Sequence, residues 1–172
     1  MKIVILLFIT LLYLYGFKLS DIKTYQANFT QTITNPQNKI LKYKGNIYIK
    51  YPSSILWNYK EPIEKDIYIK QSIVTIIEPD LEQAIITNLE KNINIFDIFK
   101  NAKLISPNNY KALFNDTDYY INVKNNQIKS ISYKDKLDNH IKIVFSKILQ
   151  NRSISNNIFE FIIPLEYDTI RK

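Results

Sequence analysis

The sequence predicts a mainly β protein, built on one antiparallel sheet of roughly ten or eleven strands that a single helix interrupts. Three observations support this class. Apolar and polar side chains alternate along most segments, clusters of Asn, Asp and Pro separate these segments, and sustained helical spacing occurs in one place. A sheet with so many strands has to curl or close on itself.

The first expected strand covers residues 24–33, where Tyr25, Phe29 and Ile33 fall on one face and threonines such as Thr24 on the other. Turns at Asn35-Pro36-Gln37-Asn38, Pro52-Ser53-Ser54, Glu61-Pro62 and Glu78-Pro79-Asp80 separate the strands that follow. The next five strands are expected at 40–51, 54–60, 65–70, 72–77 and 82–87.

The second strand has the clearest pattern. Gly45, Ile47, Ile49 and Tyr51 share one face, and Pro52 ends the strand because proline lacks a backbone donor. The strand after it carries Trp57, the only tryptophan of the chain. Such an aromatic sheet favours a protein that holds an apolar ligand.

The pattern changes at residues 94–101, where Ile95, Phe96, Ile98 and Phe99 have helical spacing and Asn94 is the expected cap. A shorter helix over residues 19–23, capped by Ser20, is also expected near the start of the domain. Strands then resume at 110–114, 118–124, 127–133, 139–148 and 155–163.

The N-terminus resembles a secretory signal peptide. Lys2 precedes an apolar run of about 13 residues, shorter than the roughly 20 that a transmembrane helix requires. We expect residues 1–16 to be the signal peptide, cleaved after Gly16, and residues 17–172 to form one exported domain. An uncleaved anchor is the alternative.

Several functional classes lack the residues they require. The chain has only two glycines, Gly16 and Gly45, which excludes a P-loop, a Rossmann fingerprint and a nucleophile elbow. It has no cysteine, and its single histidine, His140, is expected on the surface. The carboxylate pairs Asp116/Asp118 and Glu78/Asp80 leave an enzyme as a distant alternative, since turns contain such residues for structural reasons. We therefore expect no catalytic residue, no metal site and no cofactor.

The formal net charge is +7, yet Arg152 and Arg171 are the only arginines among 23 basic residues. Nucleic-acid sites favour arginine, so no nucleic-acid partner is expected. Scattered lysines are typical of a solvated surface in a compositionally biased chain. A weak attraction to anionic membranes or acidic partners stays open.

A set of motifs, in order along the chain, resembles the outer-membrane lipoprotein carrier (LolA) family. They are Ala27-Asn-Phe29-Thr-Gln31, Gly45-x-Ile-Tyr-Ile-Lys-x-Pro52, Leu56-Trp57-x-Tyr59-x-x-Pro62, Glu78-Pro-Asp-Leu-Glu-Gln-Ala84 and Phe159-x-Phe161-x-x-Pro164. The resemblance implies an unclosed, strongly curved β-barrel with short helices covering its concave face. It also implies a monomeric periplasmic chaperone that takes acylated lipoproteins from an inner-membrane ABC transporter to an outer-membrane acceptor.

The resemblance, together with the alternation of the strands, suggests an acyl-binding cavity and a lid. The cavity residues are expected to be Phe29, Ile33, Ile47, Ile49, Tyr51, Leu56, Trp57, Tyr59, Ile67 and Ile69, and the lid residues Ile95, Phe96, Ile98 and Phe99. The family often has an arginine, linked to lid closure, where this chain has Tyr51. Ordinary core packing remains the alternative for both sets.

A second function on the same fold is a periplasmic sensor that binds lipids or lipoproteins. Such sensors usually carry a second C-terminal domain, for which we expect no room before Lys172. The membrane-bound acceptor of similar fold requires a lipidated cysteine, and the sequence contains none.

Overall fold

The computed structural model describes residues 17–88 and 95–172, so the expected signal peptide at 1–16 and the expected cap Asn94 lie outside the described residues. The described chain forms one sheet in the order β12-β6-β5-β4-β3-β2-β1-β11-β10-β9-β8-β7. Its strands are β1 (Thr24–Thr34), β2 (Ile40–Lys50), β3 (Ser54–Glu61), β4 (Lys65–Lys70), β5 (Ile73–Glu78), β6 (Gln83–Asn88), β7 (Lys103–Ser106), β8 (Asn109–Phe114), β9 (Thr117–Lys124), β10 (Gln127–Lys134), β11 (His140–Gln150) and β12 (Asp168–Arg171).

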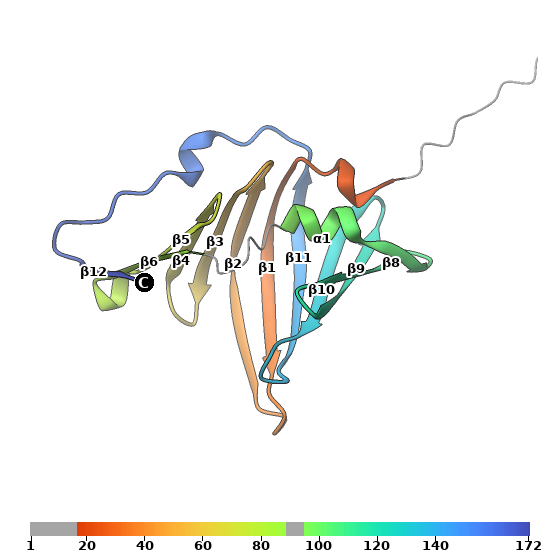
Figure 1. Cartoon of the computed structure of the whole chain (residues 1–172), viewed down its shortest axis with the longest axis horizontal. Helices are drawn as coiled ribbons and strands as arrows, with labels where there is room; N and C mark the ends of the chain where they lie inside the picture. Colours follow the sequence, from red (N-terminus) through yellow and green to blue (C-terminus); the bar gives the residue numbers. More distant parts are fainter. Residues whose placement is uncertain (1–16, 89–94) are drawn as a thin grey trace, which may run out of the picture.

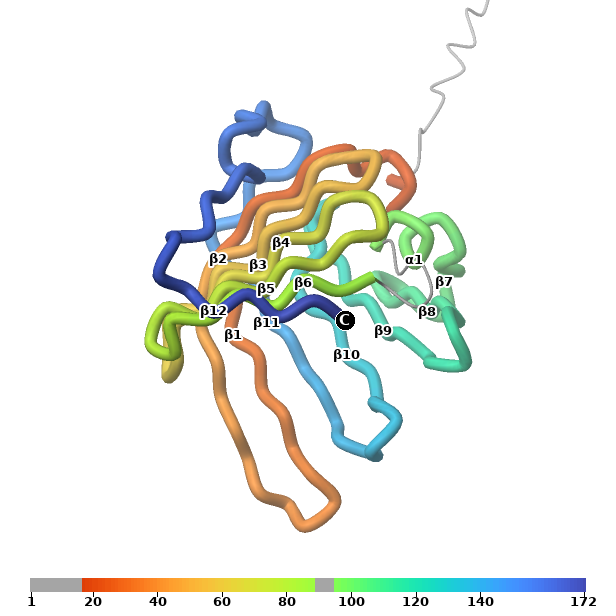
Figure 2. The backbone as a smooth tube through the Cα atoms, turned by 60° about the vertical axis from the view of Figure 1, so that its left-hand side comes forward, coloured from red at the N-terminus to blue at the C-terminus, as the bar shows by residue number. Residues whose placement is uncertain are grey.

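The sheet curves strongly without closing (Figures 1 and 2), and β12 and β7 are its two edges. Among the described residues it has twelve strands, where the sequence predicts ten or eleven. The short edge strands β7 and β12 were not predicted, and the parallel pairing of β12 with β6 departs from the expected all-antiparallel sheet. Edge strands of four residues carry too little alternation to be recognised.

The pairing registers separate the side chains of the sheet into a concave and a convex face. Tyr25 pairs with Ile49 and Ala27 with Ile47, so the expected inward face of β1 meets the expected inward face of β2. The main buried cluster lies on this concave face and extends from β3 across β1 to β8. The sheet therefore has its principal core on the side toward which it curls.

One α-helix, α1 (Ile95–Asn101), covers part of the concave face and contacts β8 and the 3-10 helix η1 (Leu19–Asp21). Figure 1 shows α1 in front of β11, β10 and β9. The described part of the predicted helix 94–101 is thus confirmed. The expected cap Ser20 is wrong, because Ser20 lies inside η1 and Lys18 occupies the cap position without a side-chain bond.

The convex face carries the C-terminal segment, where residues 155–163 form no strand, contrary to the prediction. They contain a second 3-10 helix, η3 (Asn156–Phe159), while a third, η2 (Pro79–Leu81), connects β5 and β6. Ile154 and Phe159 pack with Leu56 in a second buried cluster. The apolar residues of this segment are therefore buried against a sheet face rather than through strand pairing.

Candidate binding surface on the concave face

Two rows of apolar side chains cross the concave face at right angles to the strands. In the first row, Ile47 pairs with Trp57, Trp57 with Ile67, Ile67 with Ile76, and Ile76 with Ile85. In the second row, Ile49 pairs with Ile55, Ile55 with Ile69, and Ile69 with Val74. Cross-strand partners have neighbouring side chains on the same face of a sheet, so each row forms a continuous apolar band.

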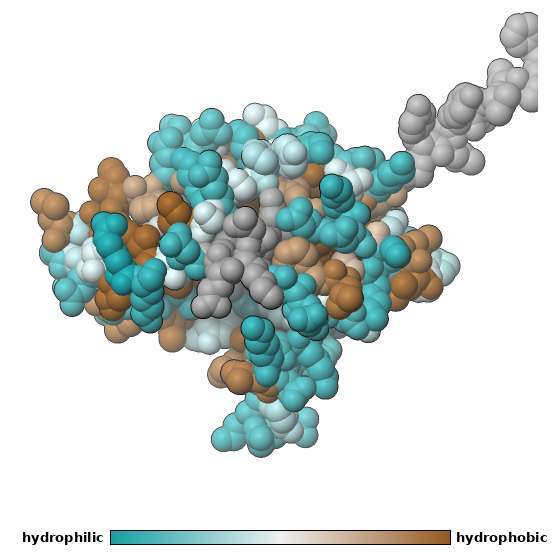
Figure 3. Space-filling view, in the orientation of Figure 1, coloured by the Kyte–Doolittle hydropathy of each residue, from teal (hydrophilic) through white to brown (hydrophobic). Residues whose placement is uncertain are grey.

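The first row becomes more exposed from the middle of the sheet toward β12. Ile47 is 0% exposed, the side chains from Trp57 to Ile85 are half-buried, and Ile170, which pairs with Ile85, is 38% exposed. Figure 3 shows hydrophobic residues gathered on the β5, β6 and β12 side of the molecule. We call the half-buried residues Trp57, Ile67, Ile69, Ile76 and Ile85 the open concave surface.

An aromatic cluster borders this surface. The ring of Phe29 makes edge-to-face contacts with Trp57 at 5.0 Å and with Tyr59 at 5.1 Å between centroids. The Tyr59 hydroxyl donates to Gln31 Oε1 at 2.9 Å, and burial raises the pKa of Tyr59 well above its usual value. The cluster therefore presents ring faces and edges, with its polar group satisfied inside the protein.

Most of the predicted cavity residues meet on the concave face. Seven of them belong to the concave cluster, namely Phe29, Ile33, Ile47, Ile49, Trp57, Tyr59 and Ile69. Ile67 shares that face through its pairing with Trp57. Ile47 and Ile49 lie at the base of the cluster, being 0% and 1% exposed, so a ligand would meet their more exposed neighbours first.

The placement of Leu56 in the cavity is wrong. Leu56 follows Ile55 and precedes Trp57 in β3, and successive strand side chains point to opposite faces. Its side chain packs with Ile154 and Phe159 on the convex side, against the C-terminal segment. Because both faces of β3 are apolar, the sequence pattern did not distinguish them.

Tyr51 lies at the rim of the concave face, in the turn after β2, and is 54% exposed. Its ring makes an edge-to-face contact with Phe96 of α1, with centroids 5.4 Å apart, and the ammonium of Lys23 lies 4.6 Å from its centroid. Tyr51 thus touches the expected lid helix through its ring.

The expected lid residues all pack with the concave cluster. Phe96, Ile98 and Phe99 are buried at 9%, 5% and 3% exposure, and Ile95 is half-buried. They cover the half of the concave face formed by β8 and its neighbours and leave the open concave surface on the other half. This arrangement is compatible with either a lid or fixed core packing.

Ile76 and Ile85 extend the surface beyond the residues predicted from the sequence. The segment Ile73-Val74-Thr75-Ile76-Ile77 is apolar on both faces, so its alternation alone does not say which side lines the cavity. The register with Ile67 decides it. To predict that Ile76 lines the concave face, one would need to know how β4 pairs with β5.

The carboxylates considered for catalysis are exposed or already paired: Glu78 accepts a hydrogen bond from Gln83 Nε2 at 3.4 Å, and Asp80 is exposed. Asp118 forms an ion pair with Lys111 at 2.8 Å, and Asp116 lies exposed in a turn with a φ of 60°. Within 17–88 and 95–172, no group of three or more acidic, histidine or cysteine side chains could hold a metal ion. None of the helices described in this structure has the length and apolarity to cross a membrane.

The convex side contains a cavity of about 730 Å³ between the sheet and the C-terminal segment. It is lined by Asp66, Tyr68, Ile77, Glu160, Phe161, Ile162, Pro164 and Tyr167. Two carboxylates among these side chains make it a poorer match for acyl chains than the apolar rows of the concave face.

Comparisons with known proteins agree with this architecture. The family described as outer membrane lipoprotein carrier protein LolA matches residues 20–103. An outer-membrane lipoprotein carrier protein of Campylobacter jejuni is 37% identical over 151 residues, covering 88% of each chain. One of Wolinella succinogenes is 33% identical over 153 residues, covering 88% of this chain and 89% of that protein.

A solved structure of an uncharacterized conserved protein from Thermus thermophilus shares the fold, with a TM-score of 0.55 and 9% identity over 89% of this chain and 93% of that one. Both sequence relatives are matched over 88% of this chain at 33% identity or more. The chain therefore belongs to the outer-membrane lipoprotein carrier protein (LolA) family.

Proposed function

We propose that this protein carries lipoproteins across the periplasm by binding their acyl chains on the open concave surface. One observation carries the proposal: the row from Trp57 through Ile67 and Ile76 to Ile85 is apolar, continuous and only half-buried. An apolar band left partly open on a concave face is typical of a binding site for an apolar ligand.

Acyl chains require such a surface outside a bilayer. Each buried methylene is worth about 0.8 kcal/mol, so a lipoprotein leaves a membrane only for another apolar site. The chemistry is binding and release, with no bond made or broken, and the protein acts as a chaperone rather than an enzyme. Periplasmic location follows from the proposed signal peptide at residues 1–16.

The helix α1 serves in this proposal as the lid. In the cargo-free protein its apolar side fills part of the concave face, and acyl chains displace it when they bind. Displacement requires that the lid be held by no more than a few kcal/mol, since cargo competes with it. We propose an inner-membrane ABC transporter as donor and an outer-membrane acceptor as recipient.

Ile67→Lys tests the proposal. Ile67 is half-buried on the open concave surface, so the new ammonium can reach water while it interrupts the apolar row. We expect a folded protein that no longer co-purifies with acylated lipoproteins, as measured by mass spectrometry of proteins recovered with it. Ile49→Lys is less informative because Ile49 is 1% exposed and a lysine there would disturb folding itself.

Ile73→Lys is the matched control. Ile73 lies in the neighbouring strand and is 48% exposed. It points to the convex face, because the next residue, Val74, belongs to the second concave row. We expect this variant to retain cargo. Equal cargo retention by Ile67→Lys and Ile73→Lys, in proteins with normal thermal melts, would contradict acyl binding on the concave face. Recovery of free lipid alone would instead support a lipid sensor.

A further inference from the structure

Two β-hairpins project side by side from one end of the molecule. The β1–β2 turn covers residues 35–39 and the β10–β11 turn covers residues 135–139. Thr34, just before the first turn, pairs with His140, just after the second. Figures 1 and 2 show both hairpins extending away from the rest of the sheet in the same direction.

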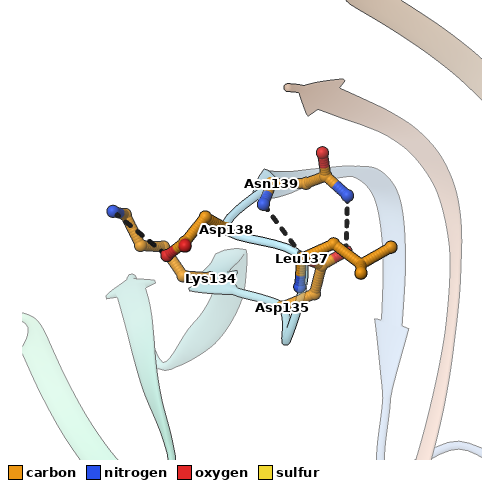
Figure 4. Close-up of polar contacts among 5 residues, drawn as sticks. All are labelled: Lys134, Asp135, Leu137, Asp138 and Asn139. Atoms are coloured by element: carbon orange, nitrogen blue, oxygen red, sulfur yellow. Dashed lines mark hydrogen bonds and ion pairs between the residues drawn. The ribbon is translucent and has the colours of Figure 1, made fainter. Parts of the chain in front are cut away.

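The two turns have the same internal structure. Asn35 Oδ1 accepts hydrogen bonds from the backbone N–H of Gln37 and of Lys39, at 3.0 and 2.8 Å. Asp135 Oδ1 accepts from the equivalent groups of Leu137 and Asn139, at 2.8 and 2.9 Å, as Figure 4 shows. The fourth residue of each turn has a φ of 60°. Side-chain bonds of this kind hold the backbone of a turn in one conformation.

The third position is where the two turns differ. The first turn has Gln37 there, an ordinary choice for solvent, whereas the second has Leu137, which is 77% exposed. Because Gln37 satisfies the same turn, the turn geometry does not require leucine. Ile40 and Leu41, directly after the first turn, are each 58% exposed. Three aliphatic side chains are therefore held in solvent at the projecting end.

The same end carries exposed basic side chains, from Lys39 and Lys42 on one hairpin and Lys134 and Lys136 on the other. Its two acidic residues are engaged locally. Asp135 is bound within its turn, where the hydrogen bond from the Asn139 side chain lowers the pKa of Asp135, and Asp138 lies 4.0 Å from Lys134. These four lysines against two carboxylates still leave a formal charge of +2 at this end.

We propose that these two turns with their flanking residues, the turn end, contact a bilayer that contains anionic lipids. Leu137, Ile40 and Leu41 enter the interfacial region, while the lysines pair with lipid phosphates. Aliphatic residues beside lysines on a projecting tip match a membrane surface, in which charged phosphates lie next to apolar acyl chains. The turn end lies apart from the open concave surface and would orient a carrier on the membrane with which it exchanges cargo.

Vesicle binding by the purified, cargo-free protein tests this inference. Because no cargo is present, a negative result would not count against acyl binding, and a failure of acyl binding would not count against membrane contact. We expect co-sedimentation with vesicles of phosphatidylethanolamine and phosphatidylglycerol that weakens at high salt, and little binding to phosphatidylcholine. Leu137→Gln should weaken partitioning by on the order of tenfold at an unchanged melting temperature, because leucine contributes apolar transfer and Gln37 shows that the turn accepts glutamine.

Leu165→Gln is the matched control, since Leu165 is 103% exposed in the C-terminal segment, away from both turns. It should bind vesicles as the unaltered protein does. The chain has no cysteine, so Leu137→Cys and Leu165→Cys can each carry a single environment-sensitive dye. We expect a blue shift with anionic vesicles at position 137 alone. Equal losses for both glutamine variants, no vesicle binding, or no shift at position 137 would overturn the inference.

Discussion

At the scale of single residues, Gly45 is required chiefly by the backbone of the neighbouring strand β3 and, less strongly, by the aromatic ring opposite it. Gly45 pairs with Phe29 in β1 and with Tyr59 in β3, on the concave face. A Cβ at this position would overlap the Asn58 carbonyl oxygen and lie 3.0 Å from Cε1 of Phe29. The missing side chain therefore leaves room for the close approach of the Asn58 carbonyl and for the Phe29 ring, which packs next to Trp57.

We predict that Gly45→Ala costs about 1–3 kcal/mol of unfolding free energy, since the overlap involves backbone and a packed ring. Urea denaturation measures it. Asn46→Ala, the next residue on the convex face, removes only a 3.4 Å hydrogen bond to Asn58 and should cost no more than about 1 kcal/mol. A Gly45→Ala midpoint equal to that of Asn46→Ala would contradict the steric explanation.

Tyr133 gives a second prediction at this scale. Burial, with smaller contributions from Tyr119 and Asp135, raises its pKa to about 12. Because this value lies above the ordinary one of about 10, the neutral ring's contribution to stability is complete below pH 10 and is lost as the pH rises toward 12. Unfolding free energies measured across this range should fall less steeply for Tyr133→Phe. Identical slopes would show that the phenol is not buried.

At the scale of elements, α1 is held at its edge by a contact from another part of the chain. Tyr51 touches Phe96 ring to ring, and the ammonium of Lys23 lies over the Tyr51 ring. Tyr51 is a neutral ring, so its contact with the helix is aromatic packing rather than an ion pair. Such a contact is worth about 0.5–1.5 kcal/mol, which is within the few kcal/mol required of the proposed lid.

We predict that Tyr51→Ala loosens α1 and increases binding of a hydrophobic fluorescent dye to the cargo-free protein, with a stability loss of about 1 kcal/mol. Tyr120→Ala is the control, because Tyr120 is also an exposed tyrosine near a lysine, Lys111, but lies on β9 away from α1. Dye binding that rises equally in both variants, or in neither, would favour fixed core packing of α1 over a lid.

At the scale of the whole molecule, the two faces of the unclosed sheet differ: one is covered by the chain itself and the other is partly open. The convex face is closed over Leu56 by the C-terminal segment, which Lys50 also fastens by donating to the Ile154 carbonyl at 2.8 Å and to Asn156 Oδ1 at 2.7 Å. The concave face keeps an apolar row partly open. In the proposed function, acyl chains enter the curved face without breaking strand pairing, because the sheet does not close.

We predict that a synthetic triacylated lipopeptide raises the melting temperature of the protein in a concentration-dependent way. Binding to the folded state alone adds about 2.7 kcal/mol at a hundredfold excess over the dissociation constant. Ile67→Lys should abolish this shift, whereas Ile73→Lys should retain it. The same peptide without acyl chains serves as the negative control, and a shift from that peptide would assign binding to another surface.

The sequence by itself determined the class of the fold and which apolar residues share the concave face. Alternation in 24–33 and 40–51 predicts the paired faces that place Phe29, Ile47 and Ile49 together, and helical spacing predicts α1. These features depend on local periodicity, because strand side chains change face at every residue and helical ones follow a period of 3.6. Composition likewise excluded the glycine-rich and cysteine-based sites.

Only the tertiary structure decided which part of the protein each apolar face contacts. Leu56 and Trp57 are adjacent and both apolar. The contact of Leu56 with Ile154 places Leu56 on the convex side, and Trp57 therefore lies on the open concave surface. The same holds for residues 155–163, which cover a face instead of pairing, and for Tyr51, whose contact with Phe96 joins distant segments. Local pattern specifies that a side chain is buried, whereas its partner depends on contacts between residues far apart in the chain.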